Sequence, residues 1–358
     1  MSYEESFFKA LREQPLRQPA RVLQALARHL GLQRLREAAR LRRAQGAGAS
    51  ILRCDGIMRP ARHKYRGYSG PWVEDAFFDY WVRESPRTKL RYLPVFWTDI
   101  YWHIQTHRWL PAQEKRYAHE LAVALRERVE PTGQYFTVLE YDHAIWDWHA
   151  FPRNVIVFSA GGCGDIPLPL LLRSPAFANP AKDIRVSFMG QLDGYSNVTG
   201  TRGKMKEVMQ GHAYLGQGPG WRDIMGRSVF SLCPRGLGRA SFRMYEALSV
   251  GSIPVYIWDD VEWLPWRDEL DWSEFSLSVN VAELDSLPQR LAAISDEQIR
   301  RMQRRIAELY DDYFTLPGVC RQIHKRVEKL ADPRQFRDLM AARPYPPGMV
   351  PVPIPEGL

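Results

Sequence analysis

The stretch at residues 228–266, SVFSLCPRGLGRASFRMYEALSVGSIPVYIWDDVEWLPW, decides the fold. An apolar run at residues 229–232 ends at the turn-forming segment 234–238, and a helix-like segment follows at residues 240–250. A second apolar run occupies residues 253–258. Strand, glycine loop, helix and strand in this order form the unit of a parallel α/β sheet.

The loop of this unit has the composition of an anion site. Gly236 and Gly238 allow the backbone to approach a ligand closely. The N–H groups of Ser241 and Phe242 lie at the expected helix N-terminus, where unpaired donors and the helix dipole favour a phosphate. The alternative is an ordinary glycine turn, because such loops are common.

The helix carries charged side chains beside this loop. Arg235, Arg239 and Arg243 are cations whose planar forks suit phosphate oxygens. Arg243 and Glu246 are three residues apart and share a helix face, so the carboxylate can accept both hydroxyls of a ribose next to a diphosphate. From spacing alone, a surface Arg–Glu pair of little energetic value is the alternative.

The segment CPRGLGRASFRMYEALSVGSIPVYIWDD resembles the signature of the exostosin-like glycosyltransferases. The resemblance is dense over residues 228–314, weaker at 185–204 and 134–170, and we see none in residues 1–45. It implies an α/β fold of the GT-B type, with two Rossmann-like domains that face each other across a cleft. The nucleotide sugar is then expected on the C-terminal domain and the acceptor on the N-terminal domain.

The resemblance also implies the reaction. We expect an inverting glycosyltransferase that moves a sugar from a nucleotide-diphosphate sugar, in our interpretation a UDP-sugar, to a hydroxyl of a glycan acceptor in polysaccharide biosynthesis. Inversion needs a single displacement by an activated hydroxyl, and we expect no cofactor. The alternative is a non-catalytic nucleotide- or sugar-binding module on the same fold.

Such a reaction needs positive charge or dipoles around the departing diphosphate. We predict that Arg235 and Arg243 supply this charge, with support from Arg202, which matches a loop residue of the family. Glu246 is the predicted ribose ligand, by position and by resemblance. The alternatives are a solvated loop charge for Arg202 and a surface carboxylate for Glu246.

The acceptor hydroxyl needs a base, which the resemblance places in the N-terminal domain. Ligands of an open parallel sheet lie beyond the carboxyl ends of its strands, so polar residues that follow predicted strands are the candidates. They are Asp142, His143, Asp165 and Asp99. Asp142 ranks first because it ends a predicted strand and matches an aspartate of the family. For each of them the alternative is the cap of a turn.

A metal-dependent site is not expected. Asp259 and Asp260 follow the apolar run 253–258, but adjacent side chains of an extended segment point to opposite faces, which is poor geometry for one shared ion. The two aspartates cap the following turn or contact donor hydroxyls. The four cysteines contain no CxxC pair, so neither a zinc site nor a disulfide framework is indicated.

Composition indicates a soluble globular protein whose 358 residues suit two domains. The net charge is +8, and residues 1–46 contribute most of it with ten basic residues against four glutamates. The remainder is nearly balanced, which argues against a nucleic-acid partner. The basic amphipathic helix predicted at residues 22–41 either lies on an anionic membrane surface or packs on the protein.

No apolar run of about 18 residues is present, so no transmembrane helix is predicted. Eukaryotic exostosins typically carry an N-terminal membrane anchor, and this chain departs from that pattern. We therefore expect a cytoplasmic, bacterial relative.

The remaining patterns give an order of elements. Strands are predicted at residues 50–54, 92–97, 135–141, 154–159 and 184–189, and helices at 114–128, 204–210, 286–313 and 332–340. The predicted divisions are a basic arm (1–46), an N-terminal Rossmann-like acceptor domain (47–178), a C-terminal Rossmann-like nucleotide-sugar domain (179–320), and a C-terminal helix with a proline-rich tail that packs back on the body (321–358).

Overall fold

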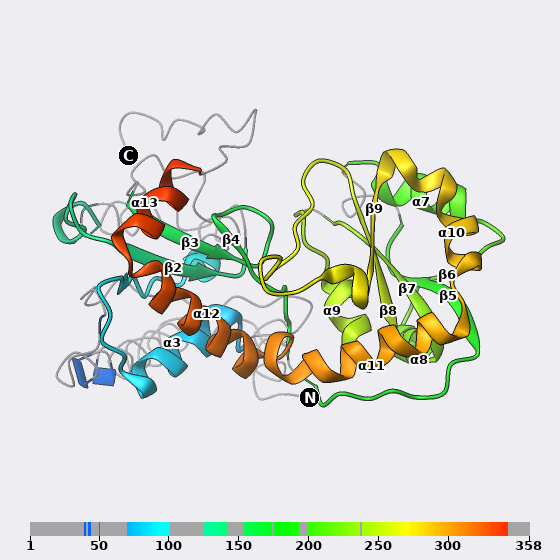
Figure 1. Ribbon diagram of the computed structural model, residues 1–358, viewed down its shortest axis with the longest axis horizontal. Coiled ribbons are helices and arrows are strands. Elements are labelled where there is room, and N and C mark those ends of the chain that lie inside the picture. The colour runs from blue at the N-terminus through cyan, green and yellow to red at the C-terminus, as the bar shows by residue number, and fades with distance from the viewer. Residues whose placement is uncertain are drawn as a thin grey trace, which may run out of the picture.

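Two separate parallel sheets lie side by side in this protein (Figure 1). The structure is a computed structural model that describes residues 39–40, 42–43, 50, 70–100, 123, 125–141, 154–173, 175–192, 199–236 and 238–342. Every strand pair in both sheets is parallel. The predicted α/β class with two Rossmann-like halves is confirmed.

The first sheet has four strands in the order β1-β2-β3-β4. They are β1 (Arg91–Tyr92), β2 (Tyr135–Leu139), β3 (Val155–Ser159) and β4 (Ile166–Pro167). All residues of β2 and β3 are buried, as continuous apolar runs in the middle of a parallel sheet require. Helix α3 (Val73–Glu84) covers this sheet and packs the rings of Phe77 and Trp81 against Phe136.

The second sheet has five strands in the order β6-β5-β7-β8-β9. They are β5 (Ile184–Met189), β6 (Tyr214–Gly216), β7 (Ser228–Pro234), β8 (Ile253–Trp258) and β9 (Leu277–Asn280). Its helices are α7 (Thr201–Met209), α8 (Trp221–Arg227) and α9 (Phe242–Ser249). The strands predicted at residues 184–189 and 253–258 occur with those bounds, and β7 and α9 follow the predicted strand–loop–helix order.

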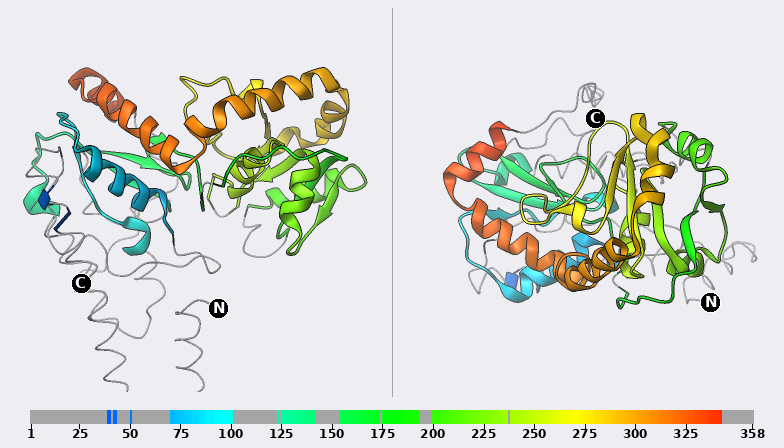
Figure 2. Two further views of the ribbon diagram at one scale, coloured as in Figure 1. Left: turned by 90° about the horizontal axis from the view of Figure 1, so that it is seen from below. Right: turned by 45° about the vertical axis from the view of Figure 1, so that its right-hand side comes forward.

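The C-terminal helices run from the second half back to the first (Figures 1 and 2). After the short helices η2 (Trp272–Glu274) and η3 (Val281–Ser286) come α10 (Leu287–Ala293), α11 (Asp296–Tyr313), α12 (Leu316–Leu330) and α13 (Pro333–Ala341). Helix α11 packs on α9 and β8, whereas α12 packs on α3. The hydroxyl of Tyr80 on α3 lies 2.9 Å from Nδ1 of His324 on α12, in hydrogen-bonding contact.

Two predicted elements differ in the structure. The strand predicted at residues 92–97 stops at Tyr92, because Pro94 has no N–H for a ladder and residues 97–100 turn helical. The helix predicted at residues 286–313 is divided into α10 and α11. Ser295 and Gln298 form a capping box between them, in which each side chain bonds the backbone N–H of the other.

Several predictions lie wholly or largely outside the described residues. They concern the strand at 50–54, the proline-rich tail, much of the helix at 114–128, and most of the basic arm. Arg40 of the arm is described: it forms a 2.7 Å ion pair with Asp79 and lies over the ring of Phe78, both on α3. Of the two alternatives for the arm, packing on the protein predicts contacts of this kind. In the described part of the chain, no helix combines the length and apolarity needed to cross a membrane.

A buried carboxyl group joins α3 to the end of β2. Oε1 of Glu74 accepts hydrogen bonds from the Thr98 hydroxyl (2.6 Å) and from the Glu140 N–H (3.0 Å). Burial raises the pKa of Glu74 to about 8, the bonds from Thr98 oppose this rise, and the nearby Asp99 adds to it. Glu74 is therefore predominantly protonated in the folded protein at pH 7.

Substitution Glu74→Gln should make unfolding less sensitive to pH. The folded protein binds more protons at Glu74 than the unfolded chain does between about pH 4.5 and 8, so this group lowers the stability of the wild type as pH rises through that window. Glutamine keeps the acceptor oxygen and cannot ionise. We expect the stability of the variant relative to wild type to rise by a few kcal/mol, as an order of magnitude, from pH 5 to pH 8.

Urea unfolding at the two pH values measures this difference. The matched control is Glu297→Gln, because Glu297 is an exposed helix carboxylate whose difference from wild type should stay constant. An equal difference for Glu74→Gln at both pH values would contradict the assignment.

Candidate functional site

The second sheet has a topological switch point between β5 and β7. The chain leaves β5 for β6 on one side and returns to β7 on the other side. In open parallel sheets, ligands bind beyond the carboxyl ends of the strands at such a point. Helices α7 and α9 begin after β5 and β7, so both direct their N-termini toward this edge.

Arg202 connects the two strand ends at the switch point. Its Nη1 donates to the Gln191 carbonyl after β5 (2.6 Å), and its Nε donates to the Arg235 carbonyl after β7 (3.1 Å). A Cβ on Gly236 would lie 3.4 Å from Nη2 of Arg202, which places this glycine beside the guanidinium. The structure thus brings Arg202, Arg235 and Gly236 together, although 33 residues separate the two arginines.

Arg235 is held by two aspartates that follow β8. Its Nη1 donates to Oδ1 of Asp259 (2.5 Å) and to Oδ1 of Asp260 (2.8 Å), and its side chain is 9% exposed. Burial acts to raise the pKa of Asp259, but hydrogen bonds from Thr199, Arg235 and Thr201 outweigh it and lower the pKa. Asp259 is therefore ionised, and much of the positive charge of Arg235 is balanced within the protein.

The prediction that the side chains of Asp259 and Asp260 point to opposite faces is wrong. Both carboxylates accept hydrogen bonds from one nitrogen, Nη1 of Arg235. The alternation of a strand does not reach them, because β8 ends at Trp258 and residues 259–260 form a bend. The cation between them is Arg235, and in the described part of the chain no third metal-ligating side chain joins them.

Arg243 and Glu246 form a pair on α9 next to the switch point. Arg243 Nη1 lies 2.5 Å from Glu246 Oε2, and both side chains are largely buried. The guanidinium of Arg243 also stacks on Trp221 at the start of α8, 4.6 Å from the ring centroid. A Cβ on Gly190 would lie 3.6 Å from Arg243 Nη2 and 3.0 Å from the ring of Phe188, over which Arg202 lies. The Arg243–Glu246 pair therefore borders the strand end that Arg202 contacts.

The other predicted residues of the loop shape it. Ser241 precedes α9 and donates from its hydroxyl to the Pro234 carbonyl (3.1 Å), so it closes the loop rather than capping the helix. Phe242 is half-buried and packs on the apolar core. Gly238 lies between Arg235 and α9, in the irregular segment that reaches the first sheet.

The predicted bases fall into three groups. Asp142 and His143 lie outside the described residues. Asp165 accepts the Val157 N–H through Oδ2 (2.8 Å) while its own N–H bonds the Val157 carbonyl, so it closes the loop after β3. Asp99 is 1% exposed beside Glu74, which keeps it from solvent and from a substrate.

Sequence reasoning missed Trp221 and Thr201. Trp221 is 22 residues from Arg243, and the only local signal was its place after a Gly-Pro-Gly turn. Thr201 is the first residue of α7 and bonds Asp259 from across the sheet (2.9 Å). Contacts of this kind depend on strand order, which a local sequence pattern does not contain.

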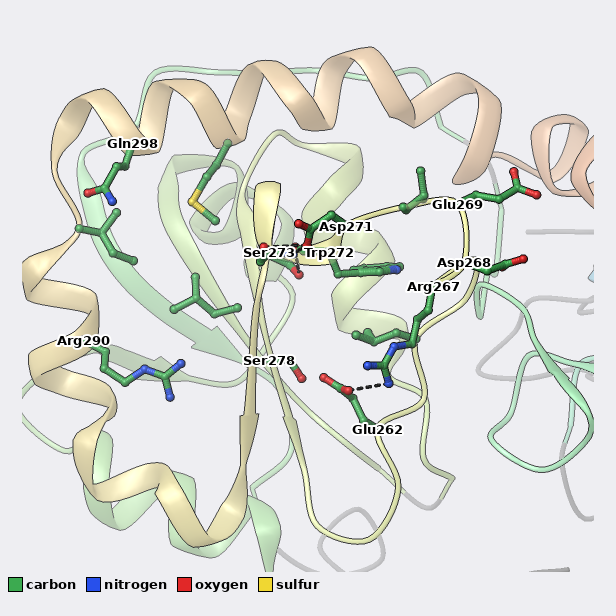
Figure 3. Close-up of a pocket in the computed structure, with 16 residues that line it drawn as sticks. Glu262, Arg267, Asp268, Glu269, Asp271, Trp272, Ser273, Ser278, Arg290 and Gln298 are labelled. Atoms are coloured by element: carbon green, nitrogen blue, oxygen red, sulfur yellow. Dashed lines mark hydrogen bonds and ion pairs between the residues drawn. The ribbon is translucent and has the colours of Figure 1, made fainter. Parts of the chain in front are cut away.

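A separate hollow of about 770 Å³ lies outside the edge strand β9 (Figure 3). It is bordered by residues 262–273, β9, α10 and α11. Most of its charged side chains are engaged in ion pairs, such as Glu262–Arg267 (2.7 Å). Because β8 lies between β9 and the β5–β7 switch point, this hollow is distinct from the arginine cluster.

Comparison with known proteins finds a match for the central part of the chain. Residues 134–294 match the exostosin GT47 domain, which confirms the resemblance seen in the sequence. A probable glycosyltransferase of Arabidopsis thaliana is 32% identical over 157 residues, 44% of this chain and 25% of the relative. An exostosin-1 homolog of Caenorhabditis elegans is 33% identical over 114 residues, 30% of this chain and 29% of the relative.

The chain thus spans about a quarter to a third of the length of these curated relatives. Among solved structures, an alpha-glucosyltransferase in complex with UDP and DNA is similar over 72% of this chain and 96% of its own, with a TM-score of 0.37 and 10% identity.

Substitution Asp259→Asn should destabilise the fold by about 1–3 kcal/mol. Asparagine keeps the volume and one acceptor but removes a charge that compensates the mostly buried Arg235. Urea unfolding measures the change. The control is Asp183→Asn, whose carboxylate is 60% exposed in its pair with Arg227 and should contribute little to stability, because solvent screens the pair. Equal losses of stability in the two variants would show that the Asp259–Arg235 pair stabilises the fold no more than an exposed ion pair does.

Proposed function

We propose, from the premise that residues 134–294 form an exostosin GT47 domain, that this protein is a glycosyltransferase. It transfers a sugar from a nucleotide-diphosphate sugar to a hydroxyl of a glycan acceptor. The observation that carries the proposal is the position of Arg202, which spans the carboxyl ends of β5 and β7. The Arg243–Glu246 pair borders the same point.

The roles of the side chains follow from charge. Negative charge grows on the leaving diphosphate in the transition state, and preorganised cations and helix N-termini stabilise it. Arg202 and Arg243 supply this charge at the switch point. Arg235 places the loop between β7 and α9 through its aspartate partners and adds to the positive field. Glu246 accepts the ribose hydroxyls, in competition with its contact to Arg243.

We propose that the base for the acceptor hydroxyl comes from the half that contains the first sheet. Asp142 and His143 follow the end of β2, so they are the proposed bases, while Asp165 maintains the loop after β3. One base that takes the acceptor proton is sufficient for a single inverting displacement. We further propose a UDP-sugar donor, metal-independent transfer, a cytoplasmic location and a role in polysaccharide biosynthesis.

Nucleotide binding tests the donor site directly. Thermal unfolding with UDP, GDP, ADP and CMP, without added metal, should show stabilisation by UDP. At about 100 times its dissociation constant a ligand adds roughly 2.7 kcal/mol, and at about 2–4 °C per kcal/mol for domains of this size Tm should rise by about 5–11 °C. The shift should be absent in Glu246→Ala. It should persist in Glu297→Ala, because Glu297 forms an exposed pair of similar local spacing on α11.

Measurement of kcat tests whether Arg202 stabilises the leaving diphosphate. Arg202→Ala should lower kcat by about 10²-fold or more if its guanidinium stabilises the leaving diphosphate. Lys206→Ala removes an exposed cation from the same helix and should leave kcat unchanged. Transfer of a radiolabelled sugar from UDP-glucuronic acid, UDP-galactose, UDP-xylose or UDP-arabinose to glycan acceptors measures the rate. Nucleotide binding without transfer to any acceptor would favour the binding module.

A further inference from the structure

Arg239 joins the loops at the carboxyl ends of the two sheets. It lies in the second half, before α9, and its Nη1 donates to the Gly162 carbonyl after β3 of the first sheet (3.0 Å). The neighbouring Ala240 N–H lies 3.4 Å from the Gly161 carbonyl. The Arg239 side chain is 12% exposed, so this contact is largely shielded from water.

The second half fixes Arg239 from two further directions. Arg239 Nε donates to Oδ2 of Asp260 (2.9 Å), while Oδ1 of the same carboxylate accepts from Arg235 (2.8 Å). The Tyr256 hydroxyl donates to the Arg239 carbonyl (2.8 Å). One carboxylate therefore links the guanidinium of the donor-side loop to the guanidinium that reaches the first sheet.

The first half is shaped to receive Arg239. Gly162 has a φ of +124°, which residues with side chains rarely adopt. A Cβ at this position would lie 2.6 Å from both Cβ and N of Arg239, too close for any side chain. The two loops are thus in contact through backbone as well as through the guanidinium.

We propose that Arg239 is a positioning residue, which aligns the acceptor-side loop 160–165 with the donor-binding loop of the second half. This inference rests on the proposed function, because alignment matters only if a donor on one half reacts with an acceptor on the other. Arg239 acts through the Gly162 carbonyl and the Asp260 carboxylate, and it does not contact either substrate.

Kinetics separate alignment from stability. In Arg239→Gln we expect stabilisation by UDP to match wild type, whereas kcat for sugar transfer falls by about tenfold or more because the reacting groups are misaligned. Arg239→Lys keeps one charged contact but not the fork, so it should recover part of kcat. Equal loss of UDP binding and of kcat, or an unchanged kcat, would overturn the proposal.

A glycine pair provides a matched test from the other half. Gly162→Ala should reproduce the loss of kcat, because its Cβ meets Arg239. Gly211→Ala is the control: Gly211 also has a positive φ (+78°), but a Cβ there meets no atom within 4 Å. A similar loss of kcat in both variants would assign the effect to backbone strain and overturn the alignment role.

A third measurement does not depend on activity. Hydrogen–deuterium exchange of residues 160–165 should be faster in Arg239→Gln than in wild type, with exchange of β7 unchanged. If the wild type binds no nucleotide and transfers no sugar, the proposed function fails, and exchange still decides whether Arg239 joins the two loops. Unchanged exchange at residues 160–165 would reject the contact itself.

Discussion

The two aspartates after β8 hold Arg235, and the rest of the site depends on this interaction. An almost buried guanidinium costs several kcal/mol unless opposite charges compensate it. The pairing requires the backbone to leave strand geometry at Asp259, so that both carboxylates reach one nitrogen. With Arg235 fixed, its carbonyl accepts from Arg202, and the second oxygen of Asp260 accepts from Arg239. Two carboxylates thus help to place three arginines.

Helices α11 and α12 connect the two halves of the molecule (Figure 2). Helix α11 packs on the second half and α12 on the first, with only Phe314 and Thr315 between them. Phe314 is fully buried and packs on the rings of Trp272 and Phe275, while the Thr315 side chain caps α12. A junction anchored in this way restricts rotation between the helices. Arg239 connects the halves at the sheet edges, so the halves are held at two places.

The predictions made from the sequence were most accurate for elements whose structure is determined by one local pattern. The bounds of β5 and β8 followed from apolar runs that end at glycine or aspartate, because a central parallel strand is buried on both faces. Helix α12 was not predicted, although its apolar spacing is regular; Pro317 and Gly318 are the residues in it that disfavour a helix. In the structure both residues lie in its first turn, where proline is tolerated. The partners of Arg235 and Arg239 could not be predicted, because strand order and the contact between the sheets bring them together.

Charge balance links the aspartates to the proposed donor. The arginines that border the switch point are Arg202, Arg235 and Arg243, and the carboxylates bonded to two of them are Asp259, Asp260 and Glu246. These six side chains are neutral as a set, and Arg239, which shares Asp260, is directed toward the first sheet. The N-termini of α7 and α9 add about half a positive charge each. Without the two aspartates the set would carry two more positive charges, and Arg235 would be buried without compensation. In the proposed reaction, the aspartates therefore orient the arginines and leave a moderate positive field for the diphosphate of the donor.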